Sequence, residues 1–154
     1  MRAFGFTGNR QKGFQRHHVI PVNIIGNSVF AGLFAVVAHV GFSPHSFVAN
    51  GVLLPSTEAM AVQTGLPLHR GPHKQYDELI AEGLDIICQE MRRGQVTDKV
   101  AILRLLSEFV GHIRRTLQHD GALLLNRHDP RGTPRPLSKL DADIFRLGSA
   151  DLLA

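Results

Sequence analysis

The stretch FQRHHVIP, residues 14–21, places two adjacent histidines near the end of what its pattern predicts to be a short strand. Neighbouring side chains of a strand point to opposite faces, so His17 and His18 cannot do the same job while the strand stays regular. Either one of the two histidines is incidental, or each has a task of its own. The composition of the rest of the chain bears on this choice.

The segments that follow the histidine pair predict short elements. Residues 28–40 are nearly all apolar and lie between a possible N-cap, Asn27, and a helix-ending glycine, Gly41, so we expect a buried helix there. The stretch SPHSFVANGVLLP, residues 43–55, predicts a turn, a strand, an Asn-Gly turn and a second short strand. Residues 56–65 predict a short helix whose first residue, a serine, is the N-cap.

Two longer helices come next, each with an apolar stripe at helical spacing. The first begins at Pro72 and ends at Gly94, and the second covers residues 97–119. Because only a short turn separates them, we expect an antiparallel hairpin over residues 72–119. With two or three short strands elsewhere, the predicted fold class is α+β and mostly helical.

The composition is that of an ordinary globular domain, since 44% of the 154 residues are hydrophobic and 19% are charged. The single cysteine, Cys88, excludes an intramolecular disulfide. The longest apolar run, residues 29–38, is too short to span a bilayer, and residues 1–14 lack the apolar core of a signal peptide. We therefore expect one domain with no membrane span and no signal peptide.

The net charge is +4, from 17 basic and 13 acidic residues, and the basic excess is unevenly spread. Residues 1–75 hold six basic residues and one acid, whereas residues 76–154 hold eleven and twelve. The excess therefore lies in the half that contains the histidine pair, which favours an anionic ligand such as nucleic acid there. A mildly basic surface without a partner is the alternative.

Four of the nine histidines form two tight groups, His17-His18 and His69-x3-His73. Histidines four apart at a helix start can reach one ion together, and zinc and similar ions bind neutral imidazole nitrogens. Pro72 puts His73 in the first helical turn, where the helix dipole disfavours protonation. If His17 is the third ligand, coordination positions stay open, as in a catalytic metal site, and His18 is free to act as a general base. The alternative is two solvated or structural histidine pairs.

Three segments in this order, RHHVIP (16–21), NGVLLP (50–55) and LHRGPHKQY (68–76), resemble the AHH family of predicted nucleases. This family is a branch of the HNH or His-Me finger superfamily, and its members are often toxin modules at the ends of bacterial polymorphic toxins. The resemblance extends over residues 14–84. Arg16 stands where the family motif has alanine.

The resemblance implies a ββα-metal finger at the centre of an α+β nuclease domain, residues 1–125. The composition of residues 126–154 predicts a Pro-rich linker and a short C-terminal helix, either part of the same domain or a tail. It also implies one divalent cation, for which Zn, Ni, Mg and Mn are candidates. The implied metal ligands are His17, His69 and His73. By similarity to the family pattern, His18 has the role of general base, and Asn50 orients that base or its loop through hydrogen bonds.

Basic residues next to the motifs predict contacts to nucleic acid. Arg16, Arg70 and Lys74 adjoin the histidines, and contacts of this kind hold phosphates without reading sequence. We therefore expect a metal-dependent endonuclease of low sequence specificity, with DNA as substrate in preference to RNA. Because many members of the family are toxin modules, the resemblance suggests a toxin effector, cytoplasmic or delivered into a target cell. A small acidic immunity protein is the expected partner. The alternatives are a non-enzymatic, zinc-stabilised nucleic-acid-binding module and a metal-dependent hydrolase of a small substrate.

Overall fold

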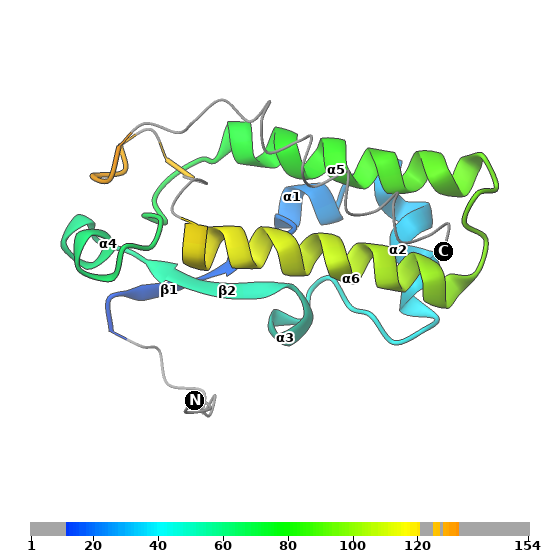
Figure 1. Cartoon of the computed structure of the whole chain (residues 1–154), viewed down its shortest axis with the longest axis horizontal. Coiled ribbons are helices and arrows are strands. Elements are labelled where there is room, and N and C mark those ends of the chain that lie inside the picture. Colours follow the sequence, from blue (N-terminus) through cyan, green and yellow to red (C-terminus); the bar gives the residue numbers. More distant parts are fainter. Residues whose placement is uncertain (1–11, 121–124, 127, 133–154) are drawn as a thin grey trace.

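The computed structural model of the chain describes residues 12–120, 125–126 and 128–132 (Figure 1). Within these residues, helices dominate and the sheet has two strands. No helix in this part of the chain is long and apolar enough to cross a membrane. The α+β fold class predicted from the sequence is confirmed.

The sheet pairs β1 (Phe14–His18) with β2 (Gly51–Pro55) in antiparallel orientation. Its register places the histidine pair opposite the first residues of β2, at the end where the connection of residues 19–50 joins the two strands. On β1, His17 is buried, whereas its neighbours Arg16 and His18, on the other face of the strand, are exposed and half-buried. The strand predicted to end at the histidine pair is confirmed.

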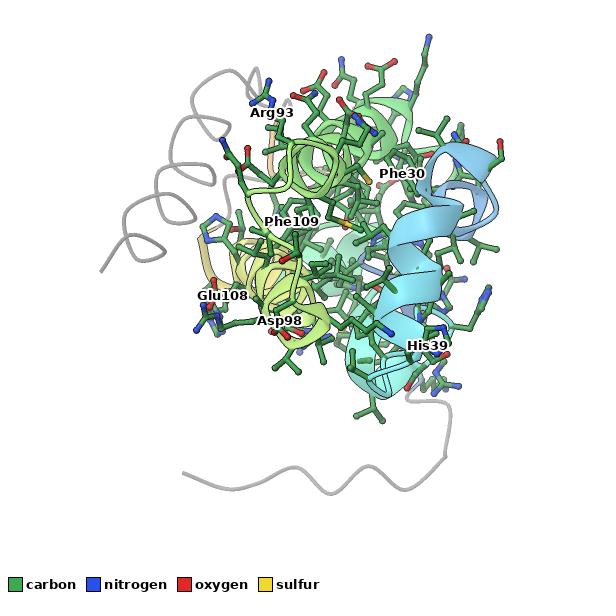
Figure 2. All side chains as sticks on the ribbon, turned by 90° about the vertical axis from the view of Figure 1, so that its right-hand side faces the viewer. Phe30, His39, Arg93, Asp98, Glu108 and Phe109 are labelled. Atoms are coloured by element: carbon green, nitrogen blue, oxygen red, sulfur yellow. The ribbon has the colours of Figure 1, made fainter. Side chains whose placement is uncertain are left out.

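The connection between the strands consists of short helical elements. They are α1 (Val22–Ile25), the 3₁₀ turn η1 (Ser28–Phe30), α2 (Ala31–Ala38) and α3 (Phe47–Asn50). The predicted N-cap is confirmed, because the Asn27 side chain accepts a hydrogen bond from the Val29 backbone N–H. The predicted burial of this helix is correct for one face only. Phe34 and Val37 of α2 are buried, whereas His39, just after the helix, is exposed on the outer side of the molecule (Figure 2).

The strand predicted before the Asn-Gly pair is wrong. Ser46 caps a helical turn instead, by accepting a hydrogen bond from the Ala49 N–H at 3.5 Å, and α3 runs as far as Asn50. At Gly51 the chain enters β2 directly, and a Cβ there would overlap with the ring of Phe47. The Asn-Gly pair therefore joins a helical turn to a strand and is not a hairpin turn.

The short helix predicted over residues 56–65 is present as α4 (Glu58–Thr64). The predicted cap, Ser56, is wrong by one residue: the Thr57 hydroxyl accepts the hydrogen bond from the Met60 N–H at 3.3 Å. Gly65 ends the helix with φ of 70°, a conformation that favours glycine.

The two predicted long helices pack side by side as an antiparallel hairpin (Figure 1). They are α5 (Lys74–Arg92) and α6 (Lys99–Arg115), and α6 continues into a π-helical turn, η2 (Thr116–Asp120). Gly83 permits their close approach, because a Cβ there would overlap with the ring of Phe109, an interior side chain in Figure 2. The Asp98 side chain caps α6 by accepting a hydrogen bond from the Ala101 N–H at 2.8 Å.

The start of α5 differs from the prediction in a way that matters for the site. The helix begins at Lys74, so His73 occupies the N-cap position instead of the first turn. The start of α5 and the end of α6 lie at the same end of the hairpin, beside the sheet, α4 and residues 128–132 (Figure 1). The predicted C-terminal helix lies outside the residues that the structure describes.

Candidate metal centre

Three histidines from different parts of the chain converge at this end of the hairpin. His17 comes from β1, His69 from the loop after α4, and His73 from the N-cap of α5. One ring nitrogen of each lies within 4.8 Å of those of the other two. The ring centroids are 4.9 Å apart for His17 and His69, and 5.1 Å apart for His69 and His73. The structure thus brings together the three residues predicted as metal ligands.

His17 is the most enclosed member of the cluster, with 5% of its surface exposed. Among the described residues, its buried Nε2 atom has no hydrogen-bond partner. Burial, reinforced by the neighbouring His69 and His73, lowers the pKa of His17 to about 3, so its imidazole is neutral at physiological pH. A buried nitrogen without a partner is costly, whereas a cation in the centre of the cluster would satisfy it.

The rings of His69 and His73 are oriented by oxygen acceptors on their far side. Nδ1 of His69 lies 3.1 Å from the side-chain oxygen of Gln15, and Nδ1 of His73 lies 3.2 Å from the Leu125 carbonyl oxygen. Because these oxygens only accept, each Nδ1 carries the hydrogen and each Nε2 keeps its lone pair. Acceptors of this kind fix the tautomer and orientation of metal-binding histidines.

Burial also lowers the pKa values of the other two rings. The pKa of His69 falls to about 4, through burial and then the charge of His73. Burial lowers the pKa of His73 as well, against the opposing effects of the Leu125 carbonyl and the Asp77 carboxylate. All three imidazoles are therefore neutral near pH 7, the state in which they bind metal ions.

This donor set fits a divalent cation. Three neutral imidazole nitrogens suit zinc and nickel by affinity, while magnesium and manganese compete through availability. In the part of the chain that the structure describes, the cluster holds three potential ligands and no fourth. Three protein ligands leave coordination positions for water or substrate, the arrangement found in catalytic metal sites.

His18 stands outside this cluster but lines the same pocket. The pocket has a volume of about 340 Å³ and is bordered by the three clustered histidines together with His18, Arg16, Asn23 and Asp77. His18 is half-buried, whereas His17 is buried. The two adjacent histidines of β1 therefore occupy different positions, as the alternation of a strand requires.

Asn50 holds the backbone that follows the histidine pair. Its fully buried side chain accepts a hydrogen bond from the Ile20 N–H at 2.7 Å and donates to the carbonyls of Ile20 and Pro44 at 3.0 and 2.8 Å. Its own carbonyl accepts from the Val19 N–H at 2.9 Å. Asn50 does not border the pocket, and its contacts reach the backbone of Val19 and Ile20 just after His18.

Tyr76 of α5 also contacts the backbone that follows the histidine pair. Its hydroxyl donates to the Val19 carbonyl at 2.5 Å, and its ring lies edge-on to His17 with a centroid distance of 5.2 Å. Burial raises the pKa of the Tyr76 hydroxyl, so it remains a proton donor. Tyr76 is both a core residue of α5 and a support for the first metal-ligand candidate.

Arg16 is the predicted phosphate contact that borders the pocket. Its guanidinium lies 4.1 Å from the centre of the Phe47 ring, a cation–π arrangement, and its side chain is exposed. The structure accommodates this long side chain because it lies on the solvent face of β1, opposite to His17.

The other two predicted phosphate contacts lie outside the pocket. Arg70 forms an ion pair with Glu58 at 3.2 Å, and Lys74 lies 3.9 Å from Glu78, its neighbour one turn along α5. All four side chains are largely exposed. The structure therefore separates Arg16 from Arg70 and Lys74, although the sequence predicts the same role for all three.

Residues beyond the predicted set also shape the site. Gln15 orients His69, and its spacing of two from His17 on a strand was a signal that both face the same side. The Asn23 amide donates to the Asp77 carboxylate at 2.9 Å at the edge of the pocket. No local sequence pattern indicates the Asn23–Asp77 contact, because it joins α1 to α5.

Arg114 of α6 fixes the junction between α3 and β2. Its guanidinium donates to the Ala49 carbonyl at 2.7 Å and to the Gly51 carbonyl at 3.0 Å. Ala49 and Gly51 flank Asn50 in the chain. Arg114 therefore ties the helical hairpin to the backbone on both sides of Asn50, the residue that bonds Val19 and Ile20 after the histidine pair. In the sequence, Arg114 is one of several basic residues on a helix and carries no special signal.

A comparison with protein-family models matches residues 4–108 to AHH, described as a nuclease family of the HNH/ENDO VII superfamily with conserved AHH. The match covers more than half of the chain and includes all the histidines of the cluster. Neither the curated proteins nor the solved structures gave a significant match.

Proposed function

Because this chain belongs to the AHH nuclease family of the HNH/ENDO VII superfamily, we propose that it is a metal-dependent endonuclease with its ion on His17, His69 and His73. The observation that carries the proposal is the convergence of three neutral imidazoles beside a fourth, His18, which lines the pocket without joining the cluster. A structural metal site has no use for that fourth ring, whereas a hydrolase needs a base there.

In the proposed reaction, His18 accepts the proton of the attacking water. His18 is half-buried and borders the same pocket as the three clustered histidines, which is where a base for the attacking water is needed. A bound divalent cation would supply stabilisation of the charge on the phosphate and on the leaving oxygen. Asn50 and Tyr76 keep the backbone after His18 in place, through bonds to Ile20 and Val19 respectively.

The substrate in this proposal is DNA, bound through its backbone. Arg16 borders the pocket with an exposed guanidinium, which suits a phosphate next to the scissile one. Arg70 and Lys74 flank the second histidine group on the surface and would contact phosphates further along the strand. Backbone contacts of this kind carry no sequence information, so we expect cleavage of low sequence specificity.

The proposal extends to the biological setting. A non-specific nuclease would harm the cell that produces it, and the basic half of the chain suits a small acidic inhibitor as its partner. We therefore propose a toxin effector with an acidic immunity protein. High-level expression of an active protein without a partner, at no cost to host growth, would contradict this part of the proposal.

The test of the activity is a parallel digestion. Purified protein is incubated with supercoiled plasmid and with total RNA, in chelator and then in Zn²⁺, Ni²⁺, Mg²⁺ and Mn²⁺ in turn. We expect plasmid nicking and linearisation that chelator abolishes and one or more of these ions restores. Intact nucleic acid under every ion, with a bound ion held by four protein ligands, would favour a zinc-stabilised binding module instead.

A further inference from the structure

Residues 125–126 and 128–132, most of which belong to the linker predicted to begin at Asn126, contact the segment between α4 and α5 that carries His69 and His73. Four of them make these contacts, and we call them the C-terminal clamp: Leu125, Asn126, Asp129 and Arg131. The described part of this segment lies near α4 and the start of α5 (Figure 1). The clamp lies beyond residue 108, where the match to the family ends.

Asp129 is the centre of the clamp, with a completely buried side chain. One carboxylate oxygen accepts a hydrogen bond from the Leu68 N–H at 2.8 Å, next to His69. The other oxygen accepts from the backbone N–H and the guanidinium of Arg131 at 2.9 and 3.2 Å. A buried carboxylate is tolerated only when it is paired and hydrogen-bonded, and each of these contacts meets that need.

The other side chains of the clamp hold the same loop on either side of Leu68. The Arg131 guanidinium donates to the Gly65 carbonyl, and the Asn126 amide donates to the Arg70 carbonyl. The loop between α4 and α5 is therefore tied at Gly65, Leu68 and Arg70. His69 lies in no helix or strand, and its own N–H donates to the Pro55 carbonyl at the end of β2 at 2.7 Å. The ties from the clamp hold the loop on both sides of that single backbone bond.

The clamp also reaches the next ligand candidate directly. The buried Leu125 presents its carbonyl oxygen to Nδ1 of His73. Such an acceptor sets the tautomer and orientation of a metal-binding ring, and loss of partners of this type typically weakens metal binding about 10- to 100-fold.

We propose that the C-terminal clamp positions the metal site, with Asp129 as its principal positioning residue. The clamp touches the loop or the ring of two of the three ligand candidates, whereas the third, His17, is fixed by the sheet. This inference rests on the metal-binding part of the proposed function. It assigns a role to a segment that follows the nuclease motif in the chain.

The test measures metal binding rather than cleavage. Zn²⁺ affinity is determined by calorimetry with a competing chelator, and the Co²⁺ absorption spectrum reports the geometry of the ligands. For Asp129→Ala we expect a loss of Zn²⁺ affinity of about tenfold, the lower end of the range for groups that bond a ligand directly, because Asp129 acts through the backbone next to His69. The Co²⁺ spectrum should be weaker and shifted. The conservative Asp129→Asn keeps an acceptor for the Leu68 N–H, so part of the affinity should return.

A control removes a carboxylate–backbone hydrogen bond of the same length far from the site. The exposed Asp98 accepts from the Ala101 N–H at 2.8 Å, at the start of α6 and so at the opposite end of the hairpin. Asp98→Ala should lower the melting temperature and leave Zn²⁺ affinity at the wild-type value. An equal loss of affinity in Asp98→Ala and Asp129→Ala would overturn the inference.

A second variant covers the case in which Asp129→Ala does not fold. Asn126→Ala removes the tie to the Arg70 carbonyl and the hydrogen bond that the Asn126 side chain accepts from the His128 N–H at 2.8 Å, and it leaves Asp129 in place. We expect a smaller, few-fold loss of Zn²⁺ affinity. Wild-type affinity in folded Asp129→Ala, or in Asn126→Ala if the first variant is unfolded, would show that the clamp does not position the site. Failure of the wild-type protein to bind any divalent ion would instead contradict the proposed function.

Discussion

The helical hairpin and the histidine cluster meet at one end of the molecule, but different interactions hold them. The contact between α5 and α6 is apolar and depends on side chains that recur at helical spacing, with Gly83 against Phe109 at its closest point. The backbone around the cluster is tied by hydrogen bonds between side chains and backbone groups far apart in sequence, such as Tyr76 to Val19 and Asp129 to Leu68. Stability and metal binding should therefore respond to different substitutions.

The largest expected effect is on the cleavage rate, and it distinguishes His18 from the histidines of the cluster. His18→Ala should reduce the single-turnover cleavage rate by about 10²- to 10⁴-fold, because a general base contributes that much, and should leave Zn²⁺ affinity unchanged. His69→Ala should lose affinity and cleavage together, because only two ligand candidates remain. Calorimetry beside a cleavage assay distinguishes the variants. If His18→Ala loses affinity as His69→Ala does, both histidines of β1 are ligands and the base lies elsewhere.

The next expected effect is on the pH dependence of the free energy of unfolding of the metal-free protein. The pKa of His17 is lowered from 6.5 to about 3 in the folded state. Between pH 3 and pH 6.5 the His17 ring is therefore protonated in the unfolded chain and neutral in the folded one. The cost of keeping this ring neutral in the fold is absent above pH 6.5, and stability is lost as pH falls from there towards 3. The slope is about 1.4 kcal/mol per pH unit from this residue.

Urea unfolding in chelator at a series of pH values between neutrality and the folded pKa measures that slope. His17→Gln removes the titrating ring, so its free energy of unfolding should fall less steeply over the same range than that of the wild type. Parallel slopes for the two proteins would show that His17 is not held neutral in the fold.

A smaller effect is expected on thermal stability alone, from a substitution between the two helices of the hairpin. In Gly83→Ala the new methyl group would overlap with the Phe109 ring, and overpacking of this kind costs about 1–3 kcal/mol. The higher helix propensity of alanine offsets this by up to about 1 kcal/mol. We expect a lower melting temperature with unchanged Zn²⁺ affinity.

Gly111→Ala is the control for that substitution. Gly111 also lies inside a long helix, but the nearest neighbour of its added methyl group is the flexible end of Arg115 at 3.3 Å. This variant should melt at the wild-type temperature or above it. If Gly83→Ala alters Zn²⁺ affinity, the two regions are coupled and the separation described above is wrong.

The same contrast explains what the sequence could predict. The hairpin could be predicted because its apolar positions repeat with the helical period. The buried residues of α5 include Tyr76, Ile80 and Leu84, as that period requires. The ends of helices and strands are harder to predict. Thr57, not Ser56, caps α4, because either neighbour can offer a hydroxyl and only the tertiary path of the chain selects one.

The error at residues 43–55 has a related cause. Asn-Gly favours a hairpin turn locally, but Asn50 is buried by hydrogen bonds to Ile20 and Pro44, and Arg114 holds the carbonyls on either side of it. Long-range contacts therefore override the local turn preference. The ligand candidates were predictable because their chemistry and spacing are local signals, whereas the C-terminal clamp reaches its loop across more than fifty residues and has no local signal.

The smallest expected effect distinguishes the basic residues within and outside the pocket. Arg16 borders the pocket and its ring partner Phe47 carries no charge, whereas Arg70 is already paired with Glu58. Arg16→Ala should therefore weaken DNA binding by about 1 kcal/mol, roughly fivefold, and lower the slope of log affinity against log salt by about one. Arg70→Ala should change both by less, because its charge is partly neutralised before DNA arrives. Anisotropy titrations of a short duplex over a salt series, on a His18→Ala background that does not cut, compare the two. A larger loss for Arg70→Ala than for Arg16→Ala would place the bound strand over α4 rather than along β1.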